Sequence, residues 1–188
     1  MERAVFLDRD GTIIEDVGYL DDCSRIKFLP GAVEAIRLLN RSGYKVIIVT
    51  NQAGVAKGYF SEEKMKEINA RMLEIIFEQG AQVNKIYYCP HHIEGIVAEY
   101  KKECSWRKPN PGMIKEAARE YDLDLANSFI IGDKISDMEA GHRAGCRTIL
   151  LTEQVRPDIA NDVPKADHIA SGLYDAVLWI QKSDIRLK

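Results

Sequence analysis

Two carboxylates stand one residue apart near the start of the chain, in the segment FLDRDGT that spans residues 6–12. Gly11 in this segment allows the backbone to come close to a bound group. Two like charges at this separation repel each other, so a cation is expected between Asp8 and Asp10 unless one of them is protonated. On its own, the segment is equally typical of a solvated turn rich in Asp and Gly.

Three further polar segments border apolar runs or helical patterns. They are Thr50-Asn51-Gln52, Arg107-Lys108-Pro109 and Gly132-Asp133-Lys134-Ile135-Ser136-Asp137. Asp133 and Asp137 are spaced i and i+4, so the first turn of a helix would bring both to one face. Taken singly, the segments are also typical of a capped turn, a solvated charged surface or a helix N-cap.

In combination, these segments contain the groups that phosphoryl transfer requires. Mg²⁺ typically takes one or two carboxylates, together with waters and the substrate phosphate. A phosphoryl group in transfer needs a nucleophile, cationic clamps, and hydroxyl or amide donors around its oxygens. A carboxylate is a competent nucleophile through an aspartyl-phosphate. The sequence therefore predicts a magnesium-dependent phosphatase in which Asp8 attacks the substrate.

The elements that must position these segments are short apolar runs alternating with helical patterns. Strands are expected at 4–7, 44–50, 85–89, 128–132, 147–151 and, as a short sixth, 168–170. Helices are expected at about 30–41, after Ser61, and at 111–121, 135–144 and 171–181. The pattern predicts an α/β fold with three α/β/α layers, Rossmann-like, with a parallel sheet of five to six strands. In such sheets the site lies at the carboxyl ends of the strands.

Composition narrows the class of protein. The chain has 188 residues, is 46% hydrophobic and carries a formal charge of -3, which predicts one domain over residues 1–188. General nucleic-acid binders are usually basic, so we expect no nucleic-acid partner. No apolar stretch suits a signal peptide or a membrane span, so we expect a cytoplasmic protein without a membrane partner. The cysteines are then expected as reduced thiols or metal ligands: Cys23, Cys89, Cys104 and Cys146.

Four motifs in chain order resemble those of the haloacid dehalogenase (HAD) superfamily, in its phosphatase branch. They are Asp8-x-Asp10-x-Thr12, Thr50, Lys108 and Gly132-Asp133-x-x-x-Asp137. The resemblance covers nearly the whole chain and implies a HAD fold without a large cap domain. It implies that Asp8 is the nucleophile, that Asp10 is the general acid/base, and that Thr50 and Lys108 hold the phosphoryl oxygens.

The same resemblance implies where the magnesium ion binds. Asp8 and Asp133 would ligate it through their carboxylates, and Asp10 through its main-chain carbonyl. Asp137 matches the position that supports the metal shell.

Within this superfamily the chain resembles the D-glycero-D-manno-heptose-1,7-bisphosphate 7-phosphatases, through segments 16–19, 50–58, 89–92 and 107–113. The implied substrate is a small sugar bisphosphate, whose anomer stays open. We expect a monomer, because a small enzyme without a cap domain closes its site with its own loops. The residues implied to contact the substrate are Asp16, Val17, Gly18, Tyr19, Asn51, Gln52, Ala53, Arg107 and Lys134. Arg107 suits a second phosphate or the sugar, because a planar guanidinium grips oxygens in pairs.

Other functions remain open. Histidinol-phosphate phosphatases share most of the pattern, although their Cys/His loop is shorter than the step from Cys89 to Cys104. A non-catalytic phosphosugar-binding domain is the rival from another class, but binding alone needs neither a nucleophile nor an acid/base. The acidic composition disfavours a phosphatase that processes nucleic-acid ends.

A Cys/His loop insertion at about 89–107 departs from the resemblance. The related loop supplies four structural zinc ligands as Cys-x-His and Cys-x-Cys. This chain has Cys89, His91 and Cys104, but Trp106 stands at the fourth position. Structural zinc sites nearly always have four protein ligands. Three outcomes are open: His92 completes the site, water completes it, or zinc is absent and Trp106 packs the loop.

Overall fold

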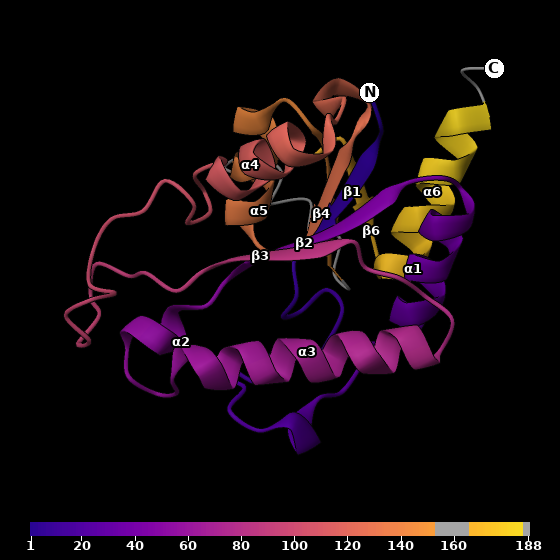
Figure 1. Cartoon of the computed structure of the whole chain (residues 1–188). Helices are drawn as coiled ribbons and strands as arrows, with labels where there is room; N and C mark the ends of the chain where they lie inside the picture. The colour runs from indigo at the N-terminus through magenta and orange to yellow at the C-terminus, as the bar shows by residue number, and fades with distance from the viewer. Residues whose placement is uncertain (153–165, 186–188) are drawn as a thin grey trace.

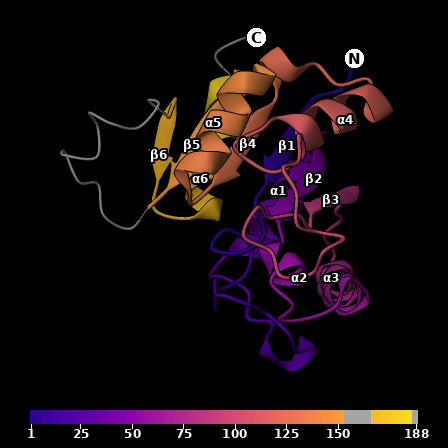
Figure 2. The same cartoon turned by 90° about the vertical axis from the view of Figure 1, so that its left-hand side faces the viewer.

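Six parallel strands form the sheet of the computed structural model, which describes residues 1–152 and 166–185. The strands in chain order are β1 (Ala4–Leu7), β2 (Lys45–Asn51), β3 (Lys85–Cys89), β4 (Phe129–Gly132), β5 (Arg147–Leu151) and β6 (His168–Ala170). Their order across the sheet is β3-β2-β1-β4-β5-β6, and every neighbouring pair is parallel. Figure 2 shows this order from β6 at one edge to β3 at the other.

Helices cover both faces of the sheet (Figure 1). They are α1 (Ala32–Arg41), α2 (Ala53–Ala56), α3 (Glu62–Glu78), α4 (Gly112–Tyr121), α5 (Ile135–Ala144) and α6 (Leu173–Ile185), with short 3₁₀ turns at Cys23–Arg25 and Leu125–Asn127. Successive strand residues point to opposite faces, so Val5 and Leu7 join the core of α1, α3 and α6. Ala4 and Phe6 join the second core, under α4 and α5. The predicted three-layer α/β/α fold is confirmed.

All predicted strands and helices are present, but some ends are shifted. β2 begins at Lys45 rather than Tyr44, because the Tyr44 N–H donates to Leu39 O in the turn after α1. It continues to Asn51, whose backbone pairs with Cys89 of β3. The last helix runs over Leu173–Ile185 rather than 171–181. The other predicted ends agree to within two residues.

The parallel order brings the carboxyl ends of β1, β2 and β4 to one edge of the sheet. In the part of the chain that the structure describes, no separate cap domain covers this edge. Loops meet beside it instead: the Tyr19 and Tyr59 rings lie 4.2 Å apart, and Ala56 O accepts from the N–H of Ile96 and of Val97. No helix among the described residues is long and apolar enough to cross a membrane.

Candidate active site

A lysine ammonium lies between two carboxylates at the centre of this edge. Lys108 Nζ is 2.8 Å from Asp8 Oδ1 and 2.6 Å from Asp137 Oδ1, and it donates to Val49 O at 2.7 Å. The contact with Val49 O is a hydrogen bond, and the two carboxylates are ion-pair partners of the ammonium. Burial alone would lower the pKa of Lys108, but the charges of Asp8 and Asp137 outweigh it and raise the pKa. The lysine is therefore a fixed cation beside the predicted nucleophile.

Asn51 holds the backbone of this lysine in place. Its Nδ2 donates to Lys108 O at 2.9 Å, and its Oδ1 accepts from Lys108 N at 3.0 Å. The end of β2 is thereby tied to the segment that precedes α4. Asn51 was predicted to contact substrate, and the structure places both atoms of its amide on the protein backbone. Ala53 follows as the first residue of α2, half-buried at the same end of β2.

Carboxylate oxygens of Asp8, Asp133 and Asp137 lie within 4.8 Å of one another. Asp137 Oδ1 forms the ion pair with Lys108, and the other oxygen of Asp137 accepts the Lys134 N–H at 3.0 Å. Asp133 Oδ1 and Asp137 Oδ1 are both buried without a hydrogen-bond partner among the described residues, but the oxygen of Asp137 has the lysine charge beside it. The pKa of Asp133 is raised to about 6, chiefly by burial, and a bound cation would restore the charged form.

The space beside Asp133 depends on a glycine. Gly11 has φ +82°, and a Cβ at this position would lie 2.3 Å from Asp133 Oδ2. The buried, unpaired oxygen and the purely carboxylate donor set both fit Mg²⁺, which prefers hard oxygen ligands. The ligand role of the Asp10 carbonyl stays a prediction.

Asp10 lies at the same edge, with its carboxylate bound by two side chains. Arg9 Nε contacts both of its oxygens, at 3.2 and 3.1 Å, and Gln52 Nε2 donates to Oδ2 at 2.9 Å. The same Gln52 nitrogen donates to Thr50 Oγ1 at 2.8 Å. The predicted acid/base and the predicted phosphate-binding hydroxyl are thus joined through Gln52. Arg9 was not singled out from the sequence, although a charged residue at the end of an apolar strand was a usable signal.

The predicted substrate segment 16–19 is joined to the start of α5. Lys134 Nζ contacts Asp16 Oδ2 at 2.8 Å, and Asp16 Oδ1 accepts the Gly18 N–H at 2.9 Å. Burial would raise the pKa of Asp16, but Lys134 and the Gly18 N–H outweigh it and lower the pKa. Val17 is exposed beside them. Asp16 therefore orients Lys134, and the sequence analysis predicted that both residues contact the substrate.

Cationic side chains gather around Tyr19. Lys57 Nζ donates to the Tyr19 hydroxyl at 3.2 Å. Arg107 is half-buried, and its Nη1 donates to His91 O at 3.2 Å. Burial lowers the pKa of His92, and the charges of Arg107 and Lys57 lower it further. We call Lys57 and Arg107 the cationic corner, and the lowered pKa of His92 favours its neutral form beside them. Lys57 and His92 were not predicted to contact substrate.

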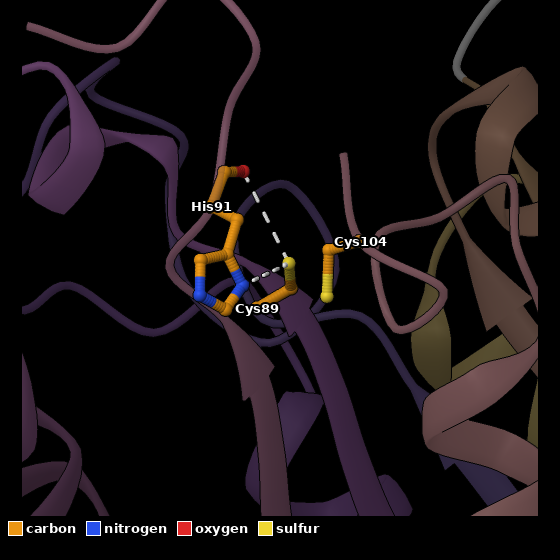
Figure 3. Close-up of side chains that lie close together, drawn as sticks. All are labelled: Cys89, His91 and Cys104. Carbon is orange, nitrogen blue, oxygen red and sulfur yellow. Dashed lines mark hydrogen bonds between the residues drawn. The ribbon is translucent and has the colours of Figure 1, made fainter. Parts of the chain in front are cut away.

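The Cys/His loop brings three of its predicted zinc ligands together, as Figure 3 shows. Ligand atoms of Cys89, His91 and Cys104 lie within 4.8 Å of one another, with Cys89 Sγ 3.8 Å from His91 Nδ1. His92 is not in this group, and its Nδ1 accepts the Glu94 N–H at 3.1 Å. The Trp106 ring packs against Tyr87 at 5.9 Å between centroids. The two thiols and the imidazole are ligand types that zinc binds, but the described residues provide no fourth ligand at this place.

The parallel α/β/α fold, the carboxylates at the strand ends and the buried lysine define a phosphatase of the HAD type. One family model, described as haloacid dehalogenase-like hydrolase, matches residues 5–87, and a HAD-hydrolase-like model matches residues 105–176.

Full-length relatives narrow the class. The chain is 38% identical over 175 residues to the D-glycero-beta-D-manno-heptose-1,7-bisphosphate 7-phosphatase of Pasteurella multocida, covering 93% of this chain and 95% of that one. It is 39% identical to the enzyme of the same name from Yersinia pestis, over 92% of both chains. The chain therefore belongs to the family of these HAD-type 7-phosphatases.

A solved structure agrees with this placement. The D,D-heptose 1,7-bisphosphate phosphatase from B. bronchiseptica, complexed with magnesium and phosphate, is 28% identical with a TM-score of 0.85. The match covers 96% of this chain and 99% of that one.

The buried ion cluster leads to a stability prediction. Lys108→Met should lower the free energy of unfolding by about 3–5 kcal/mol, because it leaves two buried carboxylates facing each other. Adding Asp137→Asn should recover part of this loss, because it removes one of the repelling charges. Urea denaturation at pH 7 measures both effects. A double variant that is less stable than Lys108→Met would contradict the charge balance described here.

Proposed function

We propose that this protein is a magnesium-dependent phosphomonoesterase that removes the 7-phosphate of D-glycero-D-manno-heptose 1,7-bisphosphate. The observation that carries the proposal is the buried cluster of Asp8, Lys108 and Asp137 beside the unpaired oxygen of Asp133. The names of the relatives and of the B. bronchiseptica neighbour support the substrate.

Asp8 is the nucleophile in this proposal. Lys108 holds its Oδ1 and so fixes the carboxylate for attack on phosphorus. The new bond joins Asp8 to phosphorus, the ester P–O bond breaks, and Asp10 in its protonated form gives its proton to the leaving sugar oxygen. This returns Asp10 to the carboxylate form that accepts from Arg9 and Gln52 in the structure. Asp10 then takes a proton from the water that hydrolyses the aspartyl-phosphate. Thr50 and Lys108 bind the phosphoryl oxygens.

Magnesium is the proposed cofactor. Asp8 and Asp133 would hold it, with Asp137 supporting the site through Lys108 and the Lys134 N–H. When bound, the ion neutralises charge between the phosphate and the carboxylates that surround it.

The cationic corner supports a bisphosphate as the substrate. Arg107 and Lys57 present positive charge beside Tyr19, where a second phosphate would be stabilised by charge-assisted hydrogen bonds. The same charges disfavour the amino end of histidinol phosphate. We further propose that the enzyme acts on this small substrate as a cytoplasmic monomer, without a nucleic-acid or membrane partner.

Removal of the nucleophile tests the reaction itself. Asp8→Asn should reduce kcat by about four orders of magnitude or more, because an amide does not form the acyl phosphate. Phosphate release in the presence of Mg²⁺ measures the loss. Asp122→Asn changes an exposed carboxylate beyond the opposite ends of the strands and serves as the matched control, with unchanged activity. Substantial turnover by Asp8→Asn would refute the nucleophile assignment.

The substrate assignment has its own test. Arg107→Met should lower kcat/KM for the heptose 1,7-bisphosphate by about 10- to 100-fold, because a charge-assisted hydrogen bond contributes about 1.5–3 kcal/mol. The heptose 7-phosphate lacks the second phosphate, so its kcat/KM should change much less. Equal losses for the two substrates would contradict the role of Arg107. Wild-type preference for histidinol phosphate would overturn the heptose assignment.

We also propose that zinc is not required to order the loop of residues 90–107. The carboxylate of Glu62 in α3 accepts the Tyr88 hydroxyl at 2.6 Å and the Tyr100 hydroxyl at 2.7 Å. The Tyr100 bond ties the loop to α3, and the Tyr88 bond ties the end of β3 to the same carboxylate. Trp106, at the sequence position of the fourth ligand, packs against Tyr87. Burial raises the pKa of Cys89 to about 12, so this thiol stays protonated without a metal.

Trypsin cleavage at the exposed Lys101 and Lys102 reports the order of this loop. Glu62→Ala should accelerate cleavage, because both tyrosine hydroxyls lose their acceptor. Glu74→Ala, on the exposed face of the same helix, is the control. Chelation followed by return of Mg²⁺ should leave the rate unchanged. Stoichiometric zinc by metal analysis, with faster cleavage after chelation, would contradict the proposal.

A further inference from the structure

Arg9 is an arginine without access to solvent. Its exposed fraction is 1%, and it lies between the two carboxylates of the first motif. A buried guanidinium is costly unless its donors are paired, and arginine is almost never fully buried without partners. The partners of Arg9 therefore indicate what its burial achieves.

The guanidinium links the catalytic edge to α3. Nη2 donates to Asp10 Oδ1 at 3.0 Å and to Gln52 Oε1 at 3.0 Å, in addition to the contacts of Nε with the Asp10 carboxylate. Nη1 donates to Asn69 Oδ1 at 2.8 Å. Asn69 is itself buried, and its Nδ2 contacts Met65 Sδ at 3.0 Å.

Asp10 is consequently held at both oxygens by groups that are themselves fixed. Arg9 binds Oδ1 and Oδ2, and Gln52 binds Oδ2. A single hydrogen bond would leave the carboxylate free to rotate, whereas this paired contact sets its plane. Asn69 in turn prevents the guanidinium from turning away, because it occupies the remaining terminal nitrogen.

We propose that Arg9, anchored by Asn69, is a positioning residue that holds the carboxylate of Asp10 in place for proton transfer. The inference rests on the proposed function, in which Asp10 is the general acid/base. It assigns a role in the reaction to Asn69, a residue of α3 that touches neither the nucleophile nor the predicted metal ligands among the contacts described above.

Substrates with different leaving groups distinguish positioning from simple stability. An alkyl phosphate such as the heptose bisphosphate expels a strongly basic oxygen and needs a proton from the general acid. p-Nitrophenyl phosphate expels a weakly basic phenolate and needs none. Because kcat/KM reports steps only through release of this leaving group, the ratio of the two kcat/KM values isolates the proton donation.

Asn69→Leu removes the acceptor for Arg9 at nearly constant volume. Its kcat/KM should fall at least tenfold more for the alkyl phosphate than for p-nitrophenyl phosphate, which is part of the roughly 10²–10⁴-fold that general acid catalysis contributes. Both substrates are measured on one sample, so any unfolded fraction cancels in the ratio. Asn69→Asp keeps the acceptor oxygen and should restore most of the ratio.

Ser128→Ala provides the matched control. Ser128 is a buried polar residue away from the catalytic edge, where its hydroxyl accepts the Ala4 N–H at 3.0 Å. Its loss should leave the ratio unchanged. Equal losses for both substrates in Asn69→Leu, or no restoration in Asn69→Asp, would overturn the inference. Failure of the wild type to hydrolyse either ester would instead refute the proposed function, so the two failures are distinguishable.

Discussion

The buried ammonium of Lys108 is the contact on which the rest of the catalytic edge depends. It draws Asp8 from the end of β1, Asp137 from the first turn of α5 and the Val49 carbonyl of β2 to one point. Without it, two carboxylates would face each other in a region of low dielectric, where their repulsion is hardly screened. The ion pairs of Lys108 therefore help to hold β1, β2 and α5 in their relative positions. The same contacts orient Asp8, the predicted nucleophile.

Negative charge exceeds positive charge at this edge. Five carboxylates and three cationic side chains meet there: Asp8, Asp10, Asp16, Asp133 and Asp137 with Arg9, Lys108 and Lys134. The residual negative charge lies by Asp133, whose Oδ1 has no partner in the described part of the chain. A phosphate dianion would meet repulsion at this place. A divalent cation removes that repulsion, which explains why the proposed hydrolysis needs magnesium although a lysine is already present.

The layer architecture followed from the sequence because a parallel strand covered on both faces has a nearly continuous apolar run, as in β2. The rule that active sites lie at the carboxyl ends of parallel strands correctly predicted that Asp8, Thr50 and Asp133 lie at the same edge of the sheet. The network of Arg9 and Asn69 did not follow, because arginine is usually exposed and its partner lies 60 residues away. The contacts of Asn51 with the backbone of Lys108 could not be predicted either, because an amide side chain at the end of a strand can bind a substrate or a neighbouring loop equally well. Side-chain partners across such distances depend on packing that residue types do not specify.

The paired hydrogen bonds between Asn51 and Lys108 limit how far changes in the neighbouring loop can disturb the edge of the sheet. Asn51 is paired in the sheet with Cys89, where the loop of residues 90–107 begins, and its amide binds the backbone of Lys108, where that loop ends. We therefore expect changes in the length or composition of that loop to leave the position of Lys108 unchanged. Surface loops on a rigid scaffold are where recognition evolves most freely. Substitutions within that loop should thus leave the contacts of Lys108 with Asp8 and Asp137 in place.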